Sequence, residues 1–355
     1  GMLVLSTGGF WLPMVLNSMG LEPAVYSIAL HYCFGVAIGI IPFFLTILLR
    51  ALIDTFGHTD LTLKLYLLGL PINACLNYIL IFGKLGLPRL GGIGAGVATG
   101  LTYWLLFILF AVTVYKIDKF KEYFLNPNKE NSQRFSVTHI KEYLRVGIPM
   151  GCSIFLEVTI FCVVAFFMAK FGTDTIAAHQ AAMNMACLVY MIPLSFSMAL
   201  TIVIGIEYGA KRFDQARIYG RLGTELSVLI AFVYLVLEYI FRDFISQVYS
   251  SDANVQHLLQ QFIIYAIVWQ CGDAIGSPIQ GALRGYKDVE ATFWSNMLAF
   301  WGICLPLGLL LDFKFNMGPF AYWQSLAFGV LCSATILIMR LKVIQKRIAR
   351  GGAAN

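Results

Sequence analysis

Charged residues are scarce in this chain. Only 12% of its 355 residues are Asp, Glu, Lys or Arg, whereas soluble domains average about 25%. The chain also lacks a CxxC pair, and its eight cysteines lie mostly in apolar runs, so we interpret them as small hydrophobic residues. There is no signal peptide, and the first residue is Gly1, not Met, which indicates that position 1 is not a natural start. The scarcity of charge argues against a soluble protein.

Long apolar runs make up much of the chain, whereas the segments of a soluble protein would include more charged residues. Most of them reach the roughly 20 residues that a helix needs to cross a membrane. They are too long for the strands of an outer-membrane barrel, which need only about 10 residues. The runs lie at Met2–Asn17, 26–49, 65–83, 93–115, 148–169, 183–206, 226–241, 258–283, 291–311 and 319–339. The sequence therefore predicts an all-α polytopic membrane protein with ten visible transmembrane helices.

The positive charges predict an orientation. If the C-terminal tail is cytoplasmic, the alternating connections place 20 of the 25 Lys and Arg residues on the cytoplasmic side. Cytoplasmic loops of membrane proteins carry such an excess. We interpret the net charge of +6 as a consequence of topology and expect no nucleic-acid partner. The expected location is a bacterial inner membrane, crossed several times, with the lipid bilayer as surroundings.

A weak internal repeat predicts two lobes. "LLRALIDTFGHTDLT" (48–62) resembles "ALRGYKDVEATFW" (282–294), with an offset of 234 residues between Arg50 and Arg284. Shifting the start of the second half back by this offset indicates that two to three helices of the first half are absent. The predicted organisation is a partial N-terminal lobe of about four helices (1–115), a cytoplasmic linker (116–138), a six-helix C-terminal lobe (139–345) and a cytoplasmic tail (346–355).

Two carboxylates lie inside predicted membrane segments. Glu157 is central in "CSIFLEVTIFCVVAFFM", and Asp273 lies in "FIIYAIVWQCGDAIGSPIQGALRG". A carboxylate at mid-bilayer costs about 2.5–3.5 kcal/mol on insertion scales, so ionisable residues there are functional by default. Such a pair could bind a hard cation through oxygen ligands or carry protons. We predict that Glu157 and Asp273 bind a coupling cation.

Further polar residues accompany this pair. Those on the helix of Asp273 form one stripe: Gln270, Asp273, Ser277 and Gln280. Pro278 and its neighbouring glycines should loosen that helix and free backbone carbonyls as cation ligands. Trp269 could be a core residue or an aromatic wall for an organic cation. Two more pairs at i and i+4 either line a cavity or make interhelical hydrogen bonds: Gln180 with Asn184, and Asn73 with Asn77.

The chain resembles the multidrug and toxic compound extrusion (MATE) transporters, most closely the NorM-like branch. The likeness covers about residues 10–345 and depends on "PINACLNYILIFGKLGLPRLGGIGAGVATGLTYW", "RVGIPMGCSIFLEVTIFCVVAFFMAKFGTDTIAAHQAAMN" and "WQCGDAIGSPIQGALRGYKD". It implies a bundle of two pseudo-symmetric six-helix lobes and an antiporter, not an enzyme, that exports small cationic, amphipathic compounds in exchange for Na⁺ or H⁺. No cofactor is implied, and we expect a monomer.

The resemblance also implies residue roles. The family's coupling glutamate and aspartate fall on Glu157 and Asp273 in the "FLEVT" and "QCGDA" contexts. Asn73 and Asn77 would partner an acid on the family's first helix, which has no counterpart here, so we expect these two amides to lack a partner. Trp269 stands where close relatives are expected to carry a tyrosine, which could shift substrate preference.

Three alternatives remain open. A flippase for a lipid-linked sugar should have more cationic residues facing its cavity to meet a pyrophosphate. An intramembrane aspartyl protease should carry a GxGD motif, and "CGDA" lacks the first glycine. The third is an inactive truncated fragment. The residue types do not choose between Na⁺ and H⁺, because both suit a Glu/Asp site.

Overall fold

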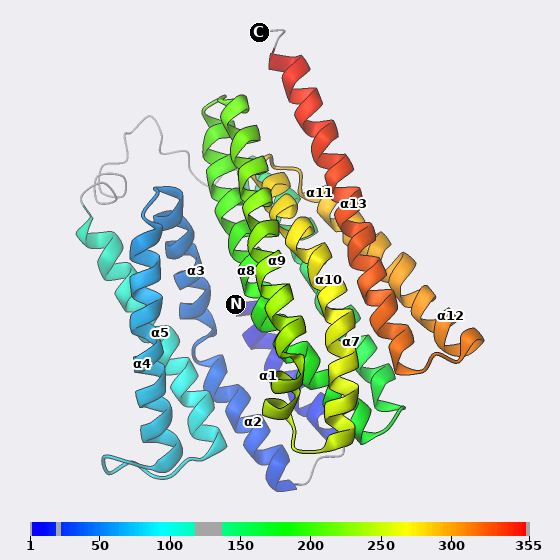
Figure 1. Ribbon diagram of the computed structural model, residues 1–355. Coiled ribbons are helices and arrows are strands. Elements are labelled where there is room, and N and C mark those ends of the chain that lie inside the picture. Colours follow the sequence, from blue (N-terminus) through cyan, green and yellow to red (C-terminus); the bar gives the residue numbers. More distant parts are fainter. Residues whose placement is uncertain (1, 19–22, 118–136, 353–355) are drawn as a thin grey trace. The chain divides into compact units, whose positions relative to one another are not determined.

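The structure is a computed structural model that describes residues 2–18, 23–117 and 137–352 (Figure 1). These residues form helices joined by short connections, and no strand occurs among them. Most of the predicted linker, 116–138, and the last residues of the predicted tail lie outside the described residues. The chain divides into two compact units, Gly1–Arg134 and Phe135–Asn355.

The first unit contains five described helices. They are α1 (Met2–Ser18), α2 (Pro23–Ala37), α3 (Ile40–Thr55), α4 (Thr59–Phe82) and α5 (Gly92–Lys116). The apolar run 26–49 becomes the pair α2 and α3, which bends by 42° at its break. At this break Gly39 lies so close to α5 that a Cβ would come within 2.8 Å of the Cα of Gly100.

Glycines bring α2 and α5 together along their length. Gly96 and Gly100 of α5 lie directly against the backbone carbonyls of Tyr32 and Gly35 of α2, without room for a side chain. Inside a membrane, small residues at this four-residue spacing let two helix backbones approach closely, because lipid supplies no hydrophobic force between helices. The glycine spacing thus positions α2 on α5.

The second unit contains the remaining described elements. They are α7 (Val137–Ala169), α8 (Thr173–Gly209), α9 (Phe213–Tyr249), α10 (Ala253–Gly285), α11 (Val289–Asn296), the π-helical segment η1 (Met297–Cys304), α12 (Leu305–Phe315) and α13 (Pro319–Gly352). The elements α11, η1 and α12 continue one another as a single membrane-length helix, Val289–Phe315. The repeated stretches 48–62 and 282–294 each join two helices, α3 to α4 and α10 to α11.

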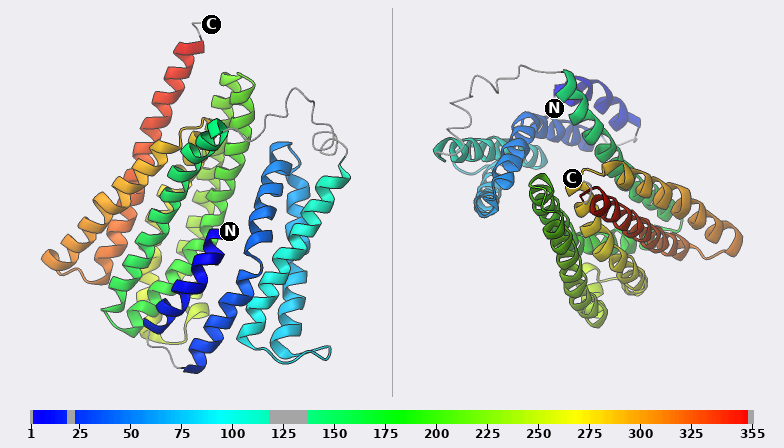
Figure 2. Two further views of the ribbon diagram at one scale, coloured as in Figure 1. Left: turned by 180° about the vertical axis from the view of Figure 1, so that it is seen from behind. Right: turned by 90° about the horizontal axis from the view of Figure 1, so that it is seen from above.

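Helix α10 is the centre of the second unit. It packs against α8, α9 and α13, and the right-hand view of Figure 2 looks down on these helices from above. Phe262 and Trp269 of α10 and Trp323 of α13 are almost fully buried, and the rings of Phe262 and Trp323 stack with centroids 5.3 Å apart. A buried aromatic cluster therefore joins α13 to the helix that carries Asp273.

Pro278 does not leave a free carbonyl, contrary to the prediction. A proline has no N–H for the carbonyl four residues before it, which in α10 is Ala274. The hydroxyl of Ser227 on α9 donates to that carbonyl at 3.0 Å. The hydroxyl of Thr201 on α8 donates to the carbonyl of Gly281 at 3.0 Å. Neighbouring helices thus occupy these oxygens, as expected for a proline in a lipid-embedded helix.

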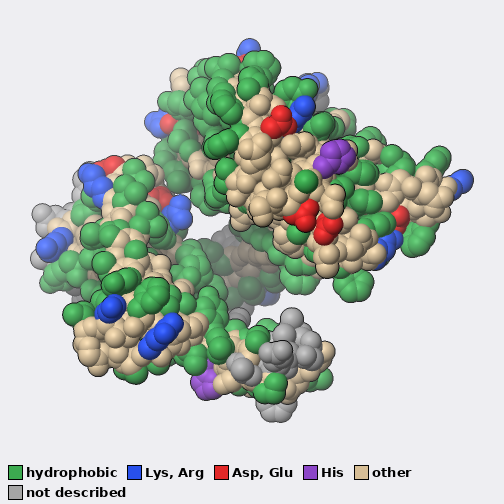
Figure 3. Space-filling view, turned by 60° about the horizontal axis from the view of Figure 1, so that its bottom comes forward, with side chains coloured by type: hydrophobic (Ala, Val, Ile, Leu, Met, Phe, Trp, Pro, Cys, Tyr) green, Lys and Arg blue, Asp and Glu red, His purple; other side chains and the backbone are tan. Residues whose placement is uncertain are grey.

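On the face drawn in Figure 3, hydrophobic side chains are abundant and charged side chains are few and scattered. Within the described ranges, seven helices are long and apolar enough to cross a membrane, or up to eight if the bent pair α2 and α3 is one span. All ten predicted runs are helical in the structure. Of these, α1 with 17 residues and α9 are not among the seven. The molecule is an all-α, multi-pass membrane protein.

Candidate functional site

Glu157 and Asp273 come together inside the second unit. Glu157 lies on α7 and Asp273 on α10, and both line one cavity of about 50 Å³. Aromatic and sulfur-containing side chains form most of the remaining wall: Phe161, Met183, Cys187, Tyr190, Trp269 and Phe300, with Ala186 and Gln270. Phe161 packs against Trp269 with ring centroids 5.1 Å apart. Two acids from different helices therefore share a small space with an apolar wall.

A second cavity of about 20 Å³ shares the same two carboxylates. Its remaining lining is more polar. Ser277 and Gln280 of α10, Asn296 of α11 and Ser333 of α13 contribute to it, together with small and apolar residues. A site of this size has room for an ion or a few water molecules, since one water needs at least about 10–15 Å³ of such volume. No group of three or more His, Cys, Asp or Glu that could hold a metal occurs among the described residues.

Asn296 connects Glu157 to the polar side of the site. Its amide Nδ2 donates to Ser153 Oγ at 2.9 Å and to Glu157 Oε2 at 3.4 Å. Its Oδ1 accepts from Gln280 Nε2 at 3.4 Å and from Ser333 Oγ at 3.3 Å. The side chain is 1% exposed. Asn296 thus gathers α7, α10 and α13 around one carboxylate.

The hydrogen bonds continue to the end of α10. Arg284, in the last turn of that helix, donates from its guanidinium to Gln280 Oε1 at 3.3 Å. Gln280 in turn donates to Asn296. Two amide side chains, Gln280 and Asn296, therefore connect the guanidinium of Arg284 to Glu157.

The π-helical segment η1 lies beside the cavities. It begins directly after Asn296 and contains Phe300, which lines both cavities. In the same segment Trp301 Nε1 donates to the carbonyl of Leu156 on α7 at 3.2 Å. Single π-helical turns inside α-helices are rare and occur frequently at functional sites, because they redirect side chains and backbone groups.

The structure groups some of the predicted residues and separates others. Trp269 and Gln270 line the first cavity, and Ser277 and Gln280 line the second. Gln180 and Asn184 of α8 are exposed and line neither cavity, and Asn184 Oδ1 accepts a hydrogen bond from Tyr249 at 2.8 Å. The stripe of α10 contributes to the site, whereas the pair on α8 lies apart from it.

Asn73 and Asn77 have partners, contrary to the expectation. Asn77 Nδ2 donates to Asn73 Oδ1 at 3.0 Å, and Asn73 Nδ2 donates to Thr102 Oγ1 of α5 at 3.0 Å. The two amides satisfy each other within the first unit because they lie one helical turn apart. Their hydrogen bonding therefore needs no acid from another helix.

Several residues of the site were not singled out from the sequence. Asn296, Ser333, Tyr190, Phe161 and Phe300 line the cavities or bond within them. Asn296 and Ser333 had a usable signal, since both are polar residues inside apolar runs. The aromatic residues had none, because 28 Phe and 17 Tyr occur in the chain and nothing in the sequence distinguishes these few from the rest.

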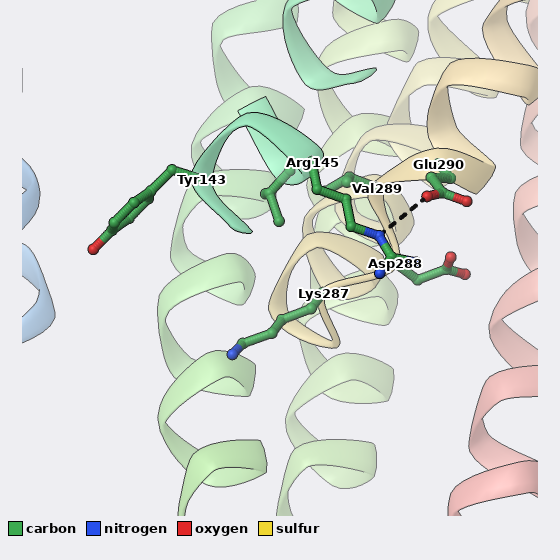
Figure 4. A pocket seen from close by; sticks show the side chains of 7 residues that line it. Tyr143, Arg145, Lys287, Asp288, Val289 and Glu290 are labelled. Atoms are coloured by element: carbon green, nitrogen blue, oxygen red, sulfur yellow. Dashed lines mark ion pairs between the residues drawn. The ribbon is translucent and has the colours of Figure 1, made fainter. Parts of the chain in front are cut away.

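A larger pocket of about 620 Å³ lies where α7 begins and α10 connects to α11 (Figure 4). Arg145 and Glu290 form an ion pair across it at 3.8 Å, while Tyr143 and Lys287 point away from this pair. Asp288 accepts two hydrogen bonds from Arg340 of α13, at 2.7 and 3.2 Å. The side chains of Arg145 and Glu290 are 83% and 61% exposed, so water screens their charges. This pocket therefore differs from the two smaller cavities, which Glu157 and Asp273 line.

Comparison with known proteins gives the same fold and a family. The family model MatE matches residues 149–310. The "Probable multidrug resistance protein NorM" of Bacillus thuringiensis subsp. konkukian is 44% identical over 345 residues, which are 97% of this chain and 76% of that protein. The protein of the same name in Bacillus subtilis is 42% identical over 349 residues, covering 98% of this chain and 76% of that protein.

Solved structures are similar to the chain along nearly its whole length. The eukaryotic MATE transporter AtDTX14 matches with a TM-score of 0.81 at 20% identity, over 96% of this chain and 75% of that one. The Vibrio cholerae MATE transporter VcmN in its bent form matches with a TM-score of 0.83 at 16% identity, over 98% of this chain and 76% of that one. These structures support the fold, and the sequence relatives establish the family. The chain belongs to the MATE family of membrane transporters.

Proposed function

We propose that this protein is a cation-coupled antiporter that exports small cationic, amphipathic organic compounds across the cell membrane. Na⁺ or H⁺ is the coupling ion, and Glu157 and Asp273 bind it. The observation that carries the proposal is that these two carboxylates, from α7 and α10, line the same two cavities. The names of the relatives, which include multidrug resistance, support the substrate class.

The volume of the cavities favours an ion as their occupant. A drug-sized ligand occupies a pocket of about 300–1,000 Å³, far larger than the 50 Å³ between Glu157 and Asp273. An organic cation would therefore need the surrounding helices to separate. The aromatic rings of Phe161 and Trp269 would then offer their faces to its charge. Ion and drug thus compete for different arrangements of the same helices, which is the basis of exchange.

Neither cavity lining contains a Lys or Arg. A pyrophosphate-linked sugar would require such groups, because phosphate is bound by charge-assisted hydrogen bonds from cationic side chains. The acidic and amide lining therefore favours cation exchange over the flippase alternative. We place the protein in the bacterial cell membrane as a monomer, with its C-terminus in the cytoplasm.

The first test is equilibrium binding of radiolabelled Na⁺ to the purified chain at several pH values. We expect saturable binding that Glu157→Gln and Asp273→Asn each abolish, because each substitution removes one anionic ligand. Glu225→Gln is the matched control, since Glu225 is an exposed acid of α9 that pairs with Arg221. Unchanged binding in both cavity variants would refute the assignment of the site.

Export is tested separately in cells that express the chain. We expect the chain to reduce accumulation of tetraphenylphosphonium, and Glu157→Gln or Asp273→Asn to remove that reduction. If the two variants export as well as the parent, the coupling mechanism is wrong. The inactive-fragment alternative holds instead if the parent fails in three respects. It does not export the probe, it does not bind Na⁺, and it releases no protons when Na⁺ is added.

A further inference from the structure

A third acid, Glu238, is buried in the second unit at the interface of α9 and α10. Glu238 is 5% exposed, although many large hydrophobic side chains of α9 are exposed. Gln270 of α10, itself 2% exposed, donates from Nε2 to Glu238 Oε1 at 3.2 Å. Within the described part of the chain no Lys, Arg or His forms an ion pair with Glu238. A buried acid without a cationic partner requires a physical explanation.

The two remaining oxygen atoms of this pair have no partner. Glu238 Oε2 and Gln270 Oε1 are both buried, and neither has a hydrogen-bond partner among the described residues. Two acceptors cannot satisfy each other, and each unsatisfied buried polar group costs about 1–3 kcal/mol. A single proton on Glu238 Oε2 changes this, because a protonated carboxyl group is a donor. The acid and the amide then bond reciprocally, the amide through Nε2 and the acid through its hydroxyl.

The surroundings of Glu238 favour the neutral acid. The titratable side chains that interact with it are Tyr234 on the same helix and Cys271 on α10, both neutral at ordinary pH. No titratable group of α8 or α13 interacts with it among the described residues. A buried carboxylate without a cationic partner is strongly disfavoured, and proteins commonly neutralise it with a proton.

We propose that Glu238 is a separate proton-binding site that positions Gln270 through a reciprocal acid–amide pair. Gln270 also lines the cavity of Glu157 and Asp273. Loss of the proton breaks one of the two hydrogen bonds that hold the amide and places a negative charge behind it. The protonation state of Glu238 thereby changes how Gln270 is held in the wall of the cavity. This consequence rests on the proposed role of the cavity in ion binding, whereas the proton site itself does not.

Infrared spectroscopy of the purified chain tests the proton directly. In a Glu157→Gln/Asp273→Asn background, which removes the two cavity acids, we expect the carbonyl band of a buried protonated carboxyl group. Adding Glu238→Gln should remove that band. The variant keeps the fold, because two amides also pair reciprocally. A spectrum that Glu238→Gln leaves unchanged, from acidic to alkaline pH, would overturn the proposal.

The link to the cavity is measured by the pH dependence of radiolabelled Na⁺ binding. We expect Na⁺ binding to be coupled to one more proton in the parent chain than in Glu238→Gln. This difference should appear in the pH dependence of the Na⁺ affinity. Glu238→Leu, which breaks the pair, should weaken binding at every pH, and Glu238→Gln should restore the affinity without the pH dependence. Equal pH profiles in the parent and Glu238→Gln would refute the link. If the parent binds no Na⁺, the proposed function fails, and the infrared band still decides the proton site.

Discussion

At the scale of single residues, a neutral side chain, that of Asn296, donates a hydrogen bond that holds the carboxylate of Glu157 in place. Asn296 donates to Glu157 Oε2 and to Ser153 Oγ with the same amide nitrogen, and its oxygen accepts from Gln280 and Ser333. An amide suits this position because it offers both donors and acceptors on one rigid plane. Under the proposed ion-binding role of Glu157, a residue that holds this carboxylate in place contributes to ion affinity.

Asn296→Ala should therefore weaken Na⁺ binding. We expect a loss of about 10- to 100-fold in affinity, as for other residues that orient metal ligands. Thermal stability should also fall, because buried donors on Gln280 and Ser333 lose their acceptor. Ser153→Ala removes one acceptor and leaves Asn296 in place, so its effect should be smaller. A normal Na⁺ affinity in Asn296→Ala, with lowered stability alone, would contradict a positioning role.

At the scale of secondary-structure elements, a glycine sets the distance between α8 and α10. A Cβ on Gly281 would clash with the backbone of Ser197, including its carbonyl carbon at 2.7 Å. The neighbouring hydrogen bond from Thr201 to the carbonyl of Gly281 depends on the same close approach. Backbone atoms cannot rotate away as a side-chain end can, so an added methyl group must push the helices apart.

Gly281→Ala should thus destabilise the protein by about 1–3 kcal/mol, the usual cost of overpacking. The measurement is thermal or denaturant unfolding in detergent. Gly276→Ala is the control on the same helix, where a Cβ would lie 3.5 Å from the Cβ of Ala334, an ordinary contact. We expect its effect to stay within about 0.5 kcal/mol. Equal losses in the two variants would show that the close approach of α8 and α10 is not what matters.

At the scale of the whole molecule, the positive charges predict how the chain lies in the membrane. The connection between α8 and α9 and the residues after it carry four cationic side chains, Lys211, Arg212, Arg217 and Arg221. Such clusters remain on the cytoplasmic side during insertion. In the second unit, helices alternate direction, so the connection after α12 should lie on the opposite side of the membrane.

Cysteine labelling tests this orientation. Ala210→Cys introduces an exposed thiol in the connection between α8 and α9, and Lys314→Cys introduces one in the last turn of α12, directly before the connection to α13. A membrane-impermeant thiol reagent added outside intact cells should label the cysteine at position 314 and not that at 210. The parent chain provides the background, because its eight cysteines lie mostly in apolar segments. The opposite labelling pattern would reverse the predicted topology.

Much of this architecture follows from the sequence alone. Apolar runs of membrane length predict helices, because in lipid a chain must satisfy its backbone hydrogen bonds within each segment. All ten runs are helical. The same rule draws attention to Glu157 and Asp273, since an acid in an apolar run is costly wherever it lies. These inferences are local: they need only the residues of one segment and the properties of the bilayer.

The tertiary structure decides which polar groups meet. Gln180 and Asn184 have the same spacing as Asp273 and Ser277 of the α10 stripe, yet they line neither cavity, whereas Asn296 lines the second. Pro278 leaves a carbonyl that Ser227 of another helix then occupies. Asn73 and Asn77 find partners in each other and in Thr102. The helices themselves are determined by the sequence, because lipid enforces hydrogen bonding within each segment. Their polar contacts depend on helix rotation and close packing, which only the folded bundle determines.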